Sequence, residues 1–378
     1  MSSSSKSSPV DLRTIAESFL LYGSFIDGAP YGSGHINDTF AVRLDQAGTP
    51  VRYILQRINS QVFRDVPGLM ENIQRVTEHA AHACATSRGD APRRALTLVP
   101  TRAGSAFHRD AGGGCWRCYL FIEKAHTSDL VQNPRQAYEA ARAFGEFQRL
   151  LVDLPGPRLH ETIPGFHDTR SRFESLKRAM VENPKSRAGK VPAELDFVLS
   201  REAMVDVLRN LQARGEIPER ITHNDTKFNN VLLDEATSER VCVIDLDTVM
   251  PGLALYDFGD MVRSATNSAV EDERDLSRVA MRMPIYEGLA SGYLAAVGNF
   301  LTPAERAHLV FAGKLITLEI GIRFLTDYLE GDVYFKTKSP DHNLDRCRNQ
   351  FALVRSIEQQ ESAMQRTAER IMKAACES

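Results

Sequence analysis

A short polar segment in the middle of the chain has the residue types and the spacing for phosphoryl transfer to a hydroxyl group. His223, Asp225 and Asn230 form the pattern HxDxxxxN. In this pattern an aspartate accepts or orients the proton of the attacking hydroxyl, and an asparagine five residues later holds a metal ion. Asp245 follows the apolar run 241–244 at the exit of a predicted β-hairpin, where a second metal ligand is expected. We therefore predict Asp225 as the catalytic residue, and Asn230 and Asp245 as ligands of Mg2+.

Aspartate and asparagine are also common in turns, so an isolated pattern of this kind can be simple turn chemistry. Here the base, the amide and the second carboxylate occur in the required order, and each lies at the end of a predicted strand. ATP carries its phosphates as a magnesium complex, so these groups supply most of the protein's part in the reaction. The sequence therefore favours an ATP- and Mg2+-dependent kinase over a structural loop.

The region after Asp245 differs from that of protein kinases. Those enzymes have an arginine at the position of Asn224 and a long segment after the metal-binding aspartate. Here Asp257 follows Asp245 by only twelve residues, which leaves little room for such a segment. The chain instead resembles the aminoglycoside and choline phosphotransferase superfamily, and within it the N-acetylhexosamine 1-kinases, in the segments HNDTKFNNVLLD, VIDLDTVMPGLALYDFGD and GIRFLTDYLEGDVYF. The resemblance extends from about residue 31 to about residue 353.

This resemblance implies a kinase that transfers the γ-phosphoryl group of ATP to the anomeric hydroxyl of N-acetylglucosamine or N-acetylgalactosamine. A kinase of the same superfamily that acts on another sugar, an amino alcohol or an aminoglycoside is the main alternative, although an acidic cluster suited to a polycationic antibiotic is lacking. A nucleotide-binding pseudokinase is a further alternative. The complete set of Asp225, Asn230 and Asp245 opposes it, and only a missing strand lysine supports it.

The resemblance also implies a protein-kinase-like α+β fold of the aminoglycoside phosphotransferase type, with a small antiparallel-sheet N-lobe, a mainly helical C-lobe and ATP in the cleft between them. The apolar period predicts helices in most of the later part of the chain, including residues 303–329. We assign residues 1–10 to a disordered tail, 11–125 to the nucleotide-binding lobe, and 126–378 to the catalytic and substrate lobe.

Four N-lobe positions are predicted to act on the nucleotide. Gly32 and Gly34 precede a strand and permit close backbone approach to a ligand, although such pairs are also frequent in ordinary hairpin turns. The next strand contains no lysine, so Arg57 is predicted to replace the usual phosphate-binding cation, with Glu71 as its ion-pair partner. A solvated surface glutamate is the alternative for Glu71. If Arg57 pointed outward, Gln56 would occupy the inward position.

The connection between the two lobes is expected after the strand that ends near residue 122. A connection of this kind normally offers backbone groups to adenine. We therefore predict nucleotide contacts from the main chain of Glu123 and Ala125, and we assign no role to their side chains.

The acceptor is predicted to meet residues from distant parts of the chain. By resemblance to the hexosamine kinases, His35 and Asp38 contribute to the sugar site, together with Asp225 at the reacting hydroxyl. A surface histidine and an aspartate turn cap are the simpler interpretations. The same resemblance gives His223 and Asp257 a supporting role, with Asp257 bonded to the backbone of the catalytic loop.

Arg323 and Tyr334 complete the predicted sugar contacts. Arg323 lies in an otherwise apolar helix, so a core salt bridge with Asp327 or Glu319 is the structural alternative. The resemblance covers this whole segment, and we therefore favour contact with the sugar.

Composition excludes several other functions. Forty-six basic residues are balanced by 49 acidic ones for a net charge of −3, so the chain lacks the excess of positive charge that is typical of nucleic-acid-binding proteins. No apolar run is long enough for a membrane span, and the N-terminus lacks the apolar core of a signal peptide. Six scattered cysteines fit a reducing cytoplasm, and Cys115 and Cys118 are interpreted as structural thiols of a strand. A small-molecule sugar is therefore the expected partner, and the oligomeric state is left open.

Overall fold

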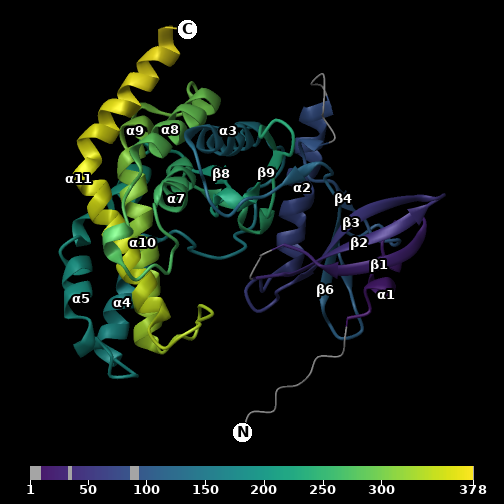
Figure 1. The fold of residues 1–378 in the computed structure, drawn as a ribbon, viewed down its shortest axis with the longest axis horizontal. Helices are drawn as coiled ribbons and strands as arrows, with labels where there is room; N and C mark the ends of the chain where they lie inside the picture. The colour runs from purple at the N-terminus through teal and green to yellow at the C-terminus, as the bar shows by residue number, and fades with distance from the viewer. Residues whose placement is uncertain (1–9, 33–35, 86–92, 378) are drawn as a thin grey trace. The chain divides into compact units, whose positions relative to one another are not determined.

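A computed structural model describes residues 10–32, 36–85 and 93–377 (Figure 1). Its backbone divides into two compact units, Met1–Lys124 and Ala125–Ser378. The first unit is built on an antiparallel sheet and the second is mainly helical.

The sheet of the first unit has the strand order β1 (Ser24–Pro30), β2 (Asp38–Gln46), β3 (Thr49–Ile58), β6 (Cys115–Leu120) and β4 (Leu98–Val99), and β5 (His108–Arg109) also pairs with β6. Alternate residues of its strands point to one face, where they form a core with α1 (Leu12–Glu17). This core includes Phe19, Val42, Leu44, Leu55, Trp116 and Cys118. The amphipathic helix α2 (Val66–Ala85) follows β3 and buries Leu69, Met70, Ile73 and Val76.

Two small sheets in the second unit position the polar segment. The strands β7 (Ala125–His126), β9 (Val231–Asp234) and β10 (Arg240–Val243) form one sheet, and β8 (Arg220–Thr222) pairs with β11 (Met250–Gly252) in the other. Residues 223–230 therefore connect β8 to β9. The two small sheets hold both ends of this connection, through β8 and β9. Asp245 lies between β10 and β11, the next two strands of the same sheets.

Helices make up most of the second unit: α3 (Pro134–Leu150), α4 (Thr169–Glu182), α5 (Pro192–Leu199), α6 (Val207–Ala213), α7 (Ala254–Thr266), α8 (Met283–Val297), α9 (Pro303–Ala307), α10 (Leu309–Glu330) and α11 (His342–Glu377). The helix α10 packs against α4, α7 and α11 (Figure 1). Its crossing with α7 is close, because a methyl group on Gly259 would lie 2.6 Å from the carbonyl oxygen of Ala312. Apolar residues of α4, α5, α10 and α11 form a common core.

The helix predicted over residues 303–329 is divided in two. The chain leaves helical geometry at His308, where φ is −105° and ψ is 10°. The His308 backbone N–H bonds to Glu305, three residues back, and the ring Nδ1 lies 2.8 Å from the carbonyl oxygen of Ala304. This tightened turn ends α9, so α10 starts afresh at Leu309. No helix in the described part of the chain is long and apolar enough to cross a membrane.

Candidate active site

The loop between β8 and β9 brings the side chains of Asp225 and Asn230 together. The Nδ2 group of Asn230 donates to the backbone oxygen of Asp225 at 2.8 Å and to its Oδ2 at 3.3 Å. These bonds fix the amide and leave its oxygen Oδ1 turned away from Asp225. An amide oxygen held in this way is a suitable hard ligand for a magnesium ion.

Backbone hydrogen bonds bring Asp245 to the same place. The N–H of Ile244 donates to the carbonyl oxygen of Asn230 at 2.9 Å, and the next residue is Asp245. Asp245 is exposed and has a left-handed backbone with φ of 60°. A non-glycine residue rarely adopts this conformation, and here it turns the chain sharply at the end of β10. The backbone of Asp245 therefore starts beside that of Asn230, which is itself bonded to Asp225, and the metal-binding role of Asn230 and Asp245 stays a prediction.

Asp257, on the first turn of α7, holds the backbone of the loop. Its carboxylate accepts the N–H of His223 at 3.0 Å and that of Asn224 at 2.7 Å, and it also accepts Nε2 of Gln148 at 2.5 Å. The side chain is fully buried. Burial raises the pKa of Asp257, whereas His223 and the three donors oppose the rise. Because Asn224 has a left-handed backbone with φ of 64°, these bonds maintain a conformation that the loop would not favour alone.

His223 lies between Asp225 and Ile244, and its two ring nitrogens face opposite partners. The backbone N–H of Asp225 donates to Nδ1 at 3.3 Å, so Nδ1 accepts, and Nε2 donates to the carbonyl oxygen of Ile244 at 2.9 Å. The ring packs edge-on against Phe144 and Phe147. His223 thus joins Asp225 to the residue that precedes Asp245.

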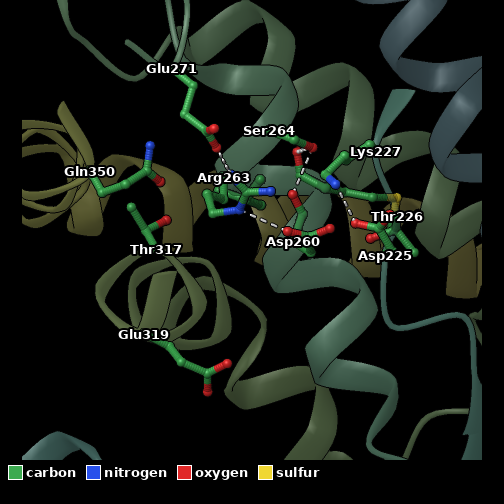
Figure 2. Close-up of polar contacts among 12 residues, drawn as sticks. Asp225, Thr226, Lys227, Asp260, Arg263, Ser264, Glu271, Thr317, Glu319 and Gln350 are labelled. Carbon is green, nitrogen blue, oxygen red and sulfur yellow. Dashed lines mark hydrogen bonds and ion pairs between the residues drawn. The ribbon is translucent and has the colours of Figure 1, made fainter. Parts of the chain in front are cut away.

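Lys227 is a charged neighbour of Asp225 that sequence reasoning missed. Its Nζ lies 2.8 Å from Oδ1 of Asp225, and the two side chains are 46% and 24% exposed (Figure 2). Burial by itself would raise the pKa of Asp225, but the charge and hydrogen bond of Lys227 outweigh this effect and hold that pKa below its ordinary value. Asp225 is therefore ionised at neutral pH. The only sequence signal was a lysine two residues after the aspartate.

A second ion pair, which is buried, lies on α7. Nε of Arg263 is 2.8 Å from Oδ1 of Asp260, and Nη1 of the same guanidinium is 3.2 Å from Glu271 (Figure 2). Both Asp260 and Arg263 are buried. Asp225 raises the pKa of Lys227 against the effect of burial, and Asp260 adds to the rise. The spacing of Asp260 and Arg263, three residues apart on a predicted helix, could have revealed this pair.

Comparison with known proteins decides the family. The family model described as the phosphotransferase enzyme family matches residues 27–306, which is most of the chain. The chain belongs to this family. It is a small-molecule phosphotransferase, and the coarser part of the expected activity is thereby confirmed.

Solved structures of phosphotransferases share the fold. An aminoglycoside phosphotransferase from Alicyclobacillus acidocaldarius has a TM-score of 0.56 at 13% identity, over 95% of this chain and 99% of that chain. An ethanolamine kinase from Plasmodium vivax has a TM-score of 0.52 at 14% identity, over 85% of this chain and 80% of that chain. A choline kinase from Cryptosporidium parvum has a TM-score of 0.50 at 16% identity, over 89% and 91%. These similarities confirm the predicted kinase-like fold.

The ion pair of the strand cation differs from the sequence prediction, whereas the contact of Arg57 with the nucleotide stays a prediction. Arg57 forms an ion pair with Asp38, with Nη2 2.5 Å from Oδ2, and not with Glu71 as predicted. Register explains the error: Arg57 lies opposite Asp38 on β2 and Trp116 on β6, so its side chain extends on the face that carries the buried indole. Glu71 is exposed on α2. Asp38, predicted as a sugar contact, is the partner of this arginine.

The opposite face of the sheet carries a different cation, Arg117 of β6. Gln56 lies opposite Arg117 on β6, and Nε of Arg117 donates to Oε1 of Gln56 at 2.9 Å. Arg117 is 1% exposed. The alternative in which Gln56 replaces Arg57 on the inward face agrees with this register. Arg117 was missed because it lies between two cysteines in a run that was interpreted only as an apolar strand.

Residues 123–125, which connect the two units, are held by hydrogen bonds and an ion pair that each lie within one unit. Nη2 of Arg93 donates to the carbonyl oxygens of Glu123 and Lys124, at 2.9 and 2.8 Å. The Glu123 side chain forms an ion pair with Arg52. In the second unit, Ala125 pairs with Asp234 as part of β7. The predicted adenine contacts of Glu123 and Ala125 stay predictions, and a nucleotide would have to share the Glu123 carbonyl with Arg93.

The glycine-rich turn is only partly described. Gly32 has a left-handed φ of 80°, and a Cβ atom there would meet open space. Gly34 and His35 lie outside the described residues. Their predicted contacts with nucleotide and sugar therefore stay predictions.

Arg323 is held by aromatic rings. Its guanidinium carbon lies 5.3 Å from the ring centre of Phe166, 5.8 Å from that of Tyr334 and 5.6 Å from that of Phe335. Tyr334 is 59% exposed, so this arrangement reaches the surface of the unit. The structure thus brings together Arg323 and Tyr334, which the sequence predicted as sugar contacts.

The two acids proposed as salt-bridge partners of Arg323 have other partners. Glu319 is 2.8 Å from Nδ1 of His167 and accepts the hydroxyl of Thr169 at 2.5 Å. Asp327 accepts the backbone N–H groups of residues 333–335 and Nδ2 of Asn343. Arg323 forms no ion pair or hydrogen bond with any residue that the structure describes. The core salt bridge considered as an alternative is therefore absent from the described chain.

Proposed function

We propose that this phosphotransferase transfers the γ-phosphoryl group of ATP to the anomeric hydroxyl of an N-acetylhexosamine, giving the sugar 1-phosphate and ADP. The observation that carries the proposal is that Asp225, Lys227 and Asn230 are bonded to one another on one loop, and that a backbone hydrogen bond joins Asn230 to the residue before Asp245. The sugar assignment is supported by the segment resemblance and by the partly exposed group formed by Arg323 and Tyr334.

The residues present fit a magnesium ion. Asn230 directs its amide oxygen away from Asp225, and Asp245 presents a carboxylate at the surface of the unit. Bound magnesium would neutralise charge on the transferred phosphates. Among the described residues no cluster of three or more His, Cys, Asp or Glu side chains could hold a metal alone. One carboxylate and one amide therefore fit a site that is completed by nucleotide phosphates and water.

Asp225 acts on the acceptor hydroxyl. Its Oδ1 is occupied by Lys227 at 2.8 Å, whereas Oδ2 has only the long contact to Asn230 at 3.3 Å. We assign Oδ2 to the hydroxyl: it orients the O–H group and receives its proton as the O1–P bond forms and the bond to ADP breaks. Because Asp225 is a weak base, its main contribution is to position the acceptor. An anomeric hydroxyl is a suitable acceptor for such a weak base, because it is more acidic than the other hydroxyl groups of a sugar.

Lys227 supplies positive charge beside the reacting atoms. An ammonium group near the aspartate stabilises negative charge that accumulates on the transferred phosphoryl group. When Asp225 becomes protonated, its pair with Lys227 weakens and the ammonium can turn to the phosphoryl oxygens. The buried ion pair of Asp260 and Arg263 keeps its own two charges in place while the ammonium group turns.

A screen of acceptors tests the proposal. The purified protein is incubated with ATP, Mg2+ and N-acetylglucosamine, N-acetylgalactosamine, simple hexoses, choline, ethanolamine or an aminoglycoside, and ADP release is measured. Phosphorus NMR then identifies the phosphorylated oxygen. We expect a sugar 1-phosphate; turnover restricted to an amino alcohol or an aminoglycoside would replace the acceptor assignment and retain the kinase.

Two variants separate true turnover from contaminating activity. Asp225→Asn should reduce kcat by about a thousandfold or more while leaving ATP affinity nearly unchanged, because it removes the base and keeps the metal ligands. Glu235→Gln, in the exposed turn between β9 and β10, is the matched control and should retain full activity. A kcat for Asp225→Asn within about tenfold of the unmodified protein would contradict the role of Asp225.

A further inference from the structure

A second arginine lies beside the aromatic group that surrounds Arg323. Nη2 of Arg172, on α4, donates to the carbonyl oxygens of Gly165 and Phe166 at 3.3 and 3.1 Å. Phe166 links the two cations, because its carbonyl oxygen binds Arg172 and its ring faces Arg323. Nε of Arg172 is buried and has no hydrogen-bond partner within the described chain.

The two guanidinium groups influence each other. Burial lowers the pKa of Arg172, and the positive charge of Arg323 lowers it further, whereas Glu319, Tyr334 and Asp168 oppose the change without reversing it. Neither arginine forms an ion pair with an acid of the described residues. Glu319 and Asp327, each four residues from Arg323 in the sequence, are already bonded: Glu319 by His167 and Thr169, and Asp327 by backbone N–H groups of residues 333–335 and by Asn343.

Aromatic rings hold a guanidinium group without neutralising it. Cation–π contacts orient Arg323 and leave its charge and its N–H donors for another partner. A partly buried pair of like charges is unfavourable unless a counter-charge is present for part of the time. Arginine donors match the planar geometry of a carboxylate and also bind phosphate, whereas neutral hydroxyl groups do not require two cations.

We propose that Arg172 and Arg323 together bind an anionic substituent of the acceptor, so that the preferred substrate is a sugar carrying a negative charge in addition to its reacting hydroxyl. This inference rests on the proposed function, since it concerns the acceptor of the same phosphoryl transfer. Tyr334, whose ring centre lies 5.8 Å from the guanidinium carbon of Arg323, closes the aromatic side of the anion site.

Matched pairs of acceptors test the proposal. The specificity constant is measured for glucose and glucuronic acid, galactose and galacturonic acid, N-acetylglucosamine and its 3-O-lactyl ether, and glucose and glucose 6-phosphate. We expect at least one anionic member to exceed its neutral partner by about tenfold or more, as a charge-assisted hydrogen bond would produce. The carboxylate and phosphate pairs show which anion is recognised.

Variants of α4 test whether Arg172 causes the preference for an anionic acceptor. Arg172→Gln should remove the preference for the anionic acceptor while leaving kcat/KM for the neutral partner within about threefold, and Arg172→Lys should keep part of it. Arg178→Gln, on the exposed side of the same helix, should change neither value. Circular dichroism melting of each variant shows whether it is folded.

The possible failures are distinguishable. A neutral acceptor that is preferred in every pair, with Arg172→Gln unchanged, overturns the anion site and leaves the proposed sugar kinase intact. Absence of any sugar phosphorylation, with turnover of another alcohol, overturns the sugar assignment and this inference together.

Discussion

Replacing Asp257 tests whether this buried carboxylate controls the catalytic loop. Asparagine keeps one oxygen and replaces the other with an NH2 group, so at least one of the N–H groups of His223 and Asn224 faces a donor instead of an acceptor. A hydrogen bond to a charged group contributes about 1.5–3 kcal/mol, and a buried unpaired donor costs about 1–3 kcal/mol. For Asp257→Asn we therefore expect the free energy of unfolding to fall by about 3–5 kcal/mol.

The same change should slow catalysis even where the protein is folded. Without the bond to Asp257, the left-handed backbone of Asn224 can relax, and Asp225 moves with it. A displacement of about 1 Å in a catalytic group can cost roughly a hundredfold in rate. We expect kcat to fall by about this factor at a temperature well below the melting transition, with ATP affinity changed little.

A matched variant separates stability from positioning. Asp327 is also buried and also accepts several backbone N–H groups, but it lies outside the catalytic loop. Asp327→Asn should lose similar stability in chemical denaturation and keep kcat at saturating sugar, with any loss confined to the KM for the sugar because Asp327 holds the backbone of Tyr334. If Asp257→Asn lost stability to the same extent and its kcat stayed within about twofold, the positioning role of Asp257 would be refuted.

Three further predictions concern the charges of the site. Lys227→Gln removes the cation that keeps the pKa of Asp225 low, and the pKa of Asp225 should therefore rise. The acid limb of the kcat–pH profile should then move to higher pH, and an unmoved limb would exclude an effective ion pair. Asp245→Asn should raise the Mg2+ concentration for half-maximal activity by about tenfold or more, measured by magnesium titration at saturating ATP, and an unchanged titration would remove Asp245 from the metal site. Arg323→Ala should reduce kcat/KM for the sugar by a factor that corresponds to about 2–4 kcal/mol of transition-state stabilisation. The KM for ATP and the Tm should change little, because no described salt bridge is lost. A lower Tm with unchanged sugar specificity would contradict the sugar contact.

Local sequence was sufficient to predict the candidate catalytic loop because its parts are close along the chain. Asp225 and Asn230 share one loop, and Asp245 ends the hairpin that follows, so a few backbone bonds, such as that from Ile244 to Asn230, suffice to assemble them. The binding partners of Asp257 could also be expected from its place in the motif. Nearby residues joined by short turns have few alternative arrangements.

Longer-range choices could not be made from the same information. Arg57 was assigned to the nucleotide because its strand contains no lysine, yet the register between β3 and β6 places it opposite Trp116, and Arg117 lies on the other face. A shift of one residue reverses the face of every side chain in a strand, and only pairing with a neighbouring strand fixes that register.

The sequence by itself predicted the phosphotransferase chemistry and the candidate catalytic loop from short spacings, and it predicted the class of fold through its resemblance to the superfamily. The tertiary structure decided which charges meet. It paired Lys227 with Asp225 and Arg57 with Asp38, and it enclosed Arg323 in aromatic rings instead of a salt bridge. Such contacts join side chains whose directions depend on how elements far apart in the chain pack, and no local pattern specifies that packing.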